Sequence, residues 1–155
     1  MKIDTDIREK VRVTFRKGRK PGHFTNHSHC DECKEHDDVL RARNVNTLTI
    51  QDVGNPGWDP ICYISPEGFE YYFPAFVRLT LAAPRESYLS QFLFHLAYEG
   101  ARNRHFRHFA PQQREVVVAF LRHVLENHRD IVEEQDCEDE LQFAISVWAL
   151  AEAGA

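Results

Sequence analysis

The sequence feature that most constrains the fold is a strong helix start at Ser65, followed by aromatic residues at helical spacing. Ser65, Pro66 and Glu67 supply a capping hydroxyl, a proline at the first helical position and an acid in the first turn. Bulky side chains then recur every three or four positions, at Phe69, Phe73, Phe76 and Thr80. Pro74 lies inside this pattern and predicts a kink or a split, because proline lacks an N–H and clashes with the preceding turn. The stretch therefore predicts a helix, bent or divided, with a buried aromatic face.

Five further segments carry helical periodicity or helix-start signals, at residues 4–15, 28–43, 86–98, 111–127 and about 136–149. The best strand candidate is Ile61–Ile64, which is short, β-branched and aromatic. Residues 102–109 alternate cations with aromatic rings, and we expect a loop between helices whose Phe side chains reach the core. The pattern predicts a mainly α fold: one compact domain over residues 1–155, with about six helices and a short strand or hairpin at most.

Charge and apolar patterning exclude several classes of protein. The net charge of −5 argues against a nucleic-acid partner. The longest apolar run, Val116–Leu121, is too short to span a bilayer, so no membrane association is expected. The N-terminus has charges every two or three residues and no apolar core of a signal peptide. These features predict a cytoplasmic protein with reduced thiols, in which Cys62 and Cys137 serve as small buried hydrophobic residues.

Residues 23–38 concentrate four of the nine histidines and two of the four cysteines. Cys30 and Cys33 have the Cys-x₂-Cys spacing common in zinc half-sites, and thiolates with imidazoles suit Zn²⁺. On a helix, His29, Cys30, Cys33 and His36 fall on one face. We therefore predict a structural zinc site on these four residues. A single helix rarely closes a tetrahedron, so His23, His27 or a distant residue is the alternative for one ligand.

Three alternatives to structural zinc stay open. A zinc-dependent hydrolase would use Glu32 or Glu35 as a base, although no His-Glu-x-x-His motif is present. A Cys-x-x-Cys thiol oxidoreductase would use a thiolate at a helix N-terminus, although the surrounding acids oppose the thiolate and no strand precedes the helix. The third alternative is a solvated polar helix with incidental His and Cys. The sequence contains no complete catalytic set, which favours a binding protein with a protein partner over an enzyme.

Two sequence motifs resemble those of an uncharacterised family of small bacterial proteins. The first is PEGFEYYFPAFVRLTL at Pro66–Leu81, with a GFxYYxPA core, and the second is FAPQQREV at Phe109–Val116 followed by AFLRHVL. Pro21-Gly22 matches the turn that follows the first helix of the family. Ala110 departs from the pattern, since Ser or Thr is expected there as the helix N-cap. The resemblance implies the fold and a bacterial origin, and it carries no catalytic residues.

Overall fold

The computed structural model describes residues 2–82 and 88–150, and helices make up most of this part of the chain. The α-helices are α1 (Thr5–Phe15), α2 (Asp31–Ala42), α3 (Ile50–Val53), α4 (Pro66–Ala82), α5 (Tyr88–Ala97), α6 (Arg104–His108), α7 (Pro111–Asn127), α8 (Arg129–Glu134) and α9 (Glu138–Trp148). Short 3-10 helices precede or join them: η1 (Lys2–Asp4), η2 (Pro60–Cys62) and η4 (Gly100–Arg102). The predicted mainly α fold is confirmed. The described residues contain more helices than expected, because the short helices α3, α6 and α8 were not predicted.

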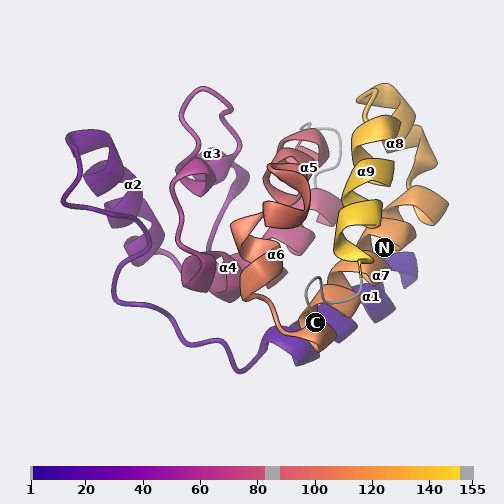
Figure 1. Cartoon of the computed structure of the whole chain (residues 1–155), viewed down its shortest axis with the longest axis horizontal. Coiled ribbons are helices and arrows are strands. Elements are labelled where there is room, and N and C mark those ends of the chain that lie inside the picture. The colour runs from indigo at the N-terminus through magenta and orange to yellow at the C-terminus, as the bar shows by residue number, and fades with distance from the viewer. Residues whose placement is uncertain (1, 83–87, 151–155) are drawn as a thin grey trace.

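The helices form a row in which α2 and α3 lie at one end, α4, α5 and α6 in the middle, and α1, α7, α8 and α9 at the other end (Figure 1). Helix α1 packs against α4 and α7, and α9 packs against α5 and α7. A long loop carries the chain from α1 along the molecule to α2 (Figure 1). The second half of this loop and the first turns of α2 form the segment in which His and Cys are concentrated.

Helix α4 passes through the centre of the core. The Ser65 hydroxyl accepts the Gly68 N–H at 3.0 Å, so the predicted cap is formed. Phe73 stacks on Phe15 of α1, with ring centroids 4.7 Å apart. The helix is continuous through Pro74, so the expected split is wrong. Pro74 lies on a partly exposed side of α4, and the buried rings before and after it keep both halves in one packed element.

The strand expected at Ile61–Ile64 is wrong, because the segment begins as the 3-10 helix η2. The Asp59 side chain caps this turn by accepting the Ile61 N–H at 2.9 Å, and Pro60 occupies its first position. Ile61 and Ile64 are buried all the same. Local capping therefore determined the backbone conformation here. The β-branched side chains indicated that the segment is buried, but not that it is a strand. The described part of the chain contains no strand.

The loop expected over residues 102–109 is also wrong, because most of it forms α6. The Asn103 side chain accepts the N–H groups of His105 and Phe106, both at 3.0 Å, and so starts the helix. Phe106 and Phe109 are buried, as expected from the sequence. The helix expected over residues 86–98 corresponds to α5, and its expected start at Glu86 lies outside the described residues. Within the described ranges, no helix combines the length and apolar character needed to cross a bilayer.

Helix α2 starts three residues later than expected, at Asp31 instead of Ser28. Cys30 is its N-cap and has an extended backbone, with φ −163° and ψ 171°. Only Leu40 and Cys33 bury apolar side chains on this helix. The Tyr72 hydroxyl of α4 donates to the Leu40 carbonyl at 2.5 Å, which fixes α2 to the core. Because its apolar face is small, α2 depends on polar contacts such as this one.

Candidate metal centre

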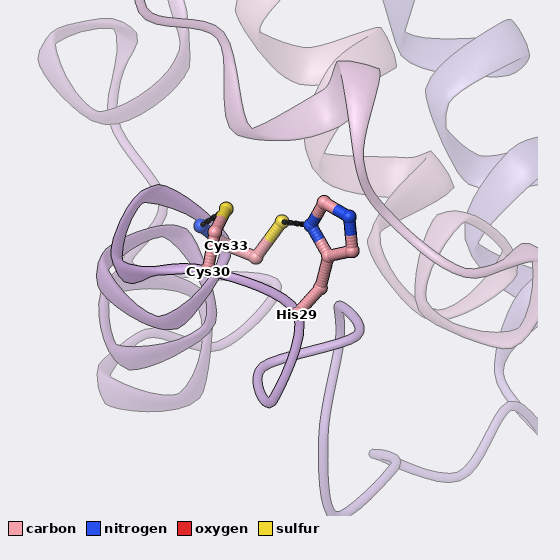
Figure 2. Close-up of side chains that lie close together, drawn as sticks. All are labelled: His29, Cys30 and Cys33. Atoms are coloured by element: carbon pink, nitrogen blue, oxygen red, sulfur yellow. Dashed lines mark hydrogen bonds between the residues drawn. The ribbon is translucent and has the colours of Figure 1, made fainter.

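The N-terminus of α2 brings together three of the four predicted zinc ligands. One donor atom each from His29, Cys30 and Cys33 lies within 4.8 Å of the other two. His29 comes from the end of the loop, Cys30 caps the helix and Cys33 lies in its first turn (Figure 2). Cys33 is buried, and the other two residues are exposed. The group is therefore half open to solvent.

The separation of the donors suits tetrahedral zinc. The Cys33 Sγ and the His29 Nδ1 are 3.7 Å apart. Bond lengths of about 2.3 Å for Zn–S and 2.0 Å for Zn–N place S and N about 3.5 Å apart in a tetrahedron. This edge of the site needs almost no adjustment to hold the ion.

The helix terminus makes the two thiols unequal. The Cys33 backbone N–H donates to the Cys30 Sγ at 3.4 Å (Figure 2). This bond, with side-chain hydrogen bonds to His29 and Cys33, lowers the pKa of Cys30. The pKa of Cys33 is raised, first by the hydrogen bond that its thiol shares with Cys30 and then by burial. Cys30 is thus the first thiolate available to a metal ion.

His36, the fourth predicted ligand, is not part of this group. Its ring is buried and lies close to the rings of Trp58 and Tyr63, with centroids 4.8 and 5.3 Å away. Its Nε2 lies 3.2 Å from the Glu32 carboxylate. The expectation of a shared helix face failed because Cys30 is an extended N-cap and His29 precedes the helix, so α2 itself carries only Cys33 and His36.

The alternative ligands His23 and His27 form a neighbouring group with Asp37. The two imidazole rings are stacked, with centroids 3.7 Å apart, and the His23 Nδ1 lies 2.8 Å from the Asp37 Oδ2. The other Asp37 oxygen accepts the N–H groups of Phe24 and Thr25 at 2.6 and 3.2 Å. Burial alone would raise the pKa of Asp37, but these hydrogen bonds together lower it. The ionised Asp37 carboxylate therefore holds the loop that precedes His29 against α2.

Two further groups of donors were missed by the sequence reasoning: Asp4 with His123 and His128, and Asp59 with Cys62 and His95. In the second group, the Asp59 Oδ1 caps η2, and the other carboxylate oxygen, Oδ2, lies 2.7 Å from the His95 Nε2. Cys62 is exposed, so the prediction of a buried Cys62 is wrong, whereas Cys137 is buried as expected. No spacing motif signals these groups, because each one includes a residue from a distant part of the sequence.

Comparison with protein families matches residues 5–151 to DUF6714, a family of unknown function. No curated protein matches the chain. No solved structure matches it either.

Proposed function

The chain belongs to the DUF6714 family of unknown function, and we propose that it is a cytoplasmic zinc-containing protein that acts by binding a protein partner. His29, Cys30 and Cys33 hold the ion. The observation that carries the proposal is the convergence of these three donors within 4.8 Å, with an S···N separation of 3.7 Å. All four cysteines are free thiols, which suits a reducing compartment.

The proposed ion has a structural role. It fixes the loop that precedes α2 to the first turn of a helix with little apolar surface of its own. A closed structural site needs a fourth protein ligand, and His23 and His27 are the nearest alternatives along the loop. Variants His23→Gln and His27→Gln distinguish them, since only loss of the true ligand weakens zinc binding.

Metal analysis of tag-free protein tests the proposal. We expect the Cys30→Ser/Cys33→Ser variant to hold about one equivalent of zinc less than the wild type. Cys137→Ala is the control, because Cys137 is a free cysteine that belongs to none of the donor groups of the described residues. A chelator is expected to lower the melting temperature of the wild type and of Cys137→Ala. Equal zinc in the wild type and the double variant, or unchanged melting in chelator, contradicts the proposal.

The lowered pKa of Cys30 beside the raised pKa of Cys33 favours thiol exchange as a second candidate function. In that case Cys30 is alkylated near neutral pH much faster than Cys62, and oxidised glutathione converts the pair to a disulfide. Two thiols then lose two protons and two electrons, and the glutathione disulfide is reduced to two thiols. Rapid disulfide formation in protein purified without zinc favours this candidate, and protection of both thiols by one bound zinc favours the first.

The proposed partner-binding surface lies beside the metal group. Trp58 and Tyr63 are 44% and 42% exposed, although both rings lie against buried His36. Exposed Trp and Tyr on a rigid support are typical of protein interfaces. A photocrosslinking amino acid at position 58 should give a discrete crosslinked protein in the native host. Position 143 is the control, because Phe143 is 51% exposed on distant α9. No product at 58, or the same product at both positions, contradicts this surface.

A further inference from the structure

Three side chains from the two halves of the chain converge next to the start of α1. Asp4 ends η1, His123 lies on α7, and His128 lies between α7 and α8. The Asp4 Oδ1 is 2.8 Å from the His123 Nε2 and 2.7 Å from the His128 Nε2. All three side chains are largely buried, with exposed fractions of 4%, 13% and 12% in that order.

We propose that Asp4, His123 and His128 form a second divalent-cation site, for an ion that takes nitrogen and oxygen ligands. Two imidazoles and one carboxylate are the donor set that proteins use for Zn²⁺, Fe²⁺ and Co²⁺. The set has a net charge of −1 when both rings are neutral, so a divalent ion leaves the site with a charge of +1.

Capping does not account for the position of Asp4. Asp4 is the N-cap of α1, yet its side chain makes no capping hydrogen bond to that helix. One oxygen of the carboxylate instead receives both imidazoles. Because both Nε2 atoms lie close to the same carboxylate oxygen, the three donor atoms surround one position that a single ion could occupy.

Only small movements would admit the ion. Metal–donor bonds of about 2.1 Å place neighbouring donors about 3.0 Å apart in an octahedron and 3.4 Å in a tetrahedron. The observed N···O separations of 2.7 and 2.8 Å therefore need to widen by well under about 1 Å. The ring centroids of His123 and His128 are 5.7 Å apart, so the two imidazoles do not stack and each ring edge can turn toward a common centre.

The surroundings supply support and access. The Asn127 amide nitrogen lies 3.2 Å from the His123 Nδ1 and donates to the His123 carbonyl at 3.1 Å, so this side chain is anchored beside the ring. His123 also borders a shallow surface hollow of about 300 Å³, together with the charged residues Asp6, Lys10, Arg122 and Glu126. His123 and His128 are 13% and 12% exposed, so solvent reaches both rings.

Cobalt titration of the full chain tests the site independently of the thiol group. In the Cys30→Ser/Cys33→Ser background, we expect one equivalent of Co²⁺ to bind with the weak visible absorption of nitrogen and oxygen ligands. Binding should weaken at least tenfold in Asp4→Asn and in His128→Gln. His108→Gln is the matched control, because His108 meets Glu70 at 3.0 Å without a second histidine.

The result that overturns the site is absence of Co²⁺ binding in the double-serine background, or equal binding in Asp4→Asn, His128→Gln and the control. Circular dichroism checks that each variant is folded. If Asp4→Asn unfolds, His123→Gln and His128→Gln decide the question, because each removes one imidazole and leaves the carboxylate in place. Failure here leaves the thiol site untouched, since the two sites share no residue.

Discussion

Replacing Asp37 tests whether this carboxylate holds the loop in front of the candidate metal centre. Asp37→Ala removes the acceptor of the buried Phe24 and Thr25 N–H groups. Each orphaned buried N–H costs about 1–3 kcal/mol, so the expected loss in the free energy of unfolding is about 3 kcal/mol. For a chain of this size the melting temperature should fall by roughly 6–12 °C. Asp37→Asn retains an acceptor oxygen but loses the charge, and should cost about 1–2 kcal/mol.

Urea unfolding in the presence of chelator measures these losses without a contribution from metal. Asp38→Ala is the matched control, because Asp38 is the neighbouring residue, is 56% exposed and only approaches Lys34 at 3.9 Å. We expect less than about 0.5 kcal/mol from this change. Because the loop carries His29, zinc affinity in Asp37→Ala should also fall about tenfold. A loss below about 1 kcal/mol, or equal losses at positions 37 and 38, would refute the reasoning.

Two further predictions concern the core. Burial, and then the nearby cation of Arg104, lowers the pKa of His105 to about 3. Below pH 6.5 the unfolded chain therefore binds a proton at this histidine that the folded protein does not bind, and stability falls. Between pH 6.5 and 5 the wild type should lose roughly 1.5 kcal/mol more stability than His105→Gln, measured by urea unfolding at both pH values; parallel losses would contradict this. Tyr72→Phe removes the buried hydroxyl that donates to the Leu40 carbonyl and leaves that carbonyl without this donor. A loss of about 1–2 kcal/mol is expected in the same assay, and an unchanged midpoint would show that α2 does not depend on this bond.

Helical periodicity was sufficient to predict α1, α4, α7 and α9, because each buries a continuous apolar stripe. It failed where a local cap or a distant contact decided the backbone. Asp59 turned the expected strand at Ile61–Ile64 into η2, and Asn103 started α6 inside an expected loop. Pro74 did not split α4, because tertiary packing of the rings around it outweighs one missing hydrogen bond.

The candidate thiol site was predictable because its three donors lie within five residues of sequence. The geometry of a helix N-cap was not predictable at the same level, so the sequence placed His36 in the group and the start of α2 too early. The Asp4 group was beyond reach of spacing arguments, since Asp4 is 119 and 124 residues from its two histidines. Such a group exists only once α1 has packed against α7.

The excess of histidine, taken alone, is a poor signal for metal in this chain. Among the described residues, six of the nine histidines lie within ion-pair distance of a carboxylate, at Asp4, Glu32, Asp37, Asp59 and Glu70. A buried carboxylate needs donors because an unpaired buried charge is costly, and a ring N–H is a donor that also packs against apolar groups. Most of these histidines are therefore explained by the acid that each one faces. His29 differs because it faces a thiol, and the pair at Asp4 differs because two rings share one oxygen. The departures from one ring per carboxylate, rather than the number of histidines, are what point to metal.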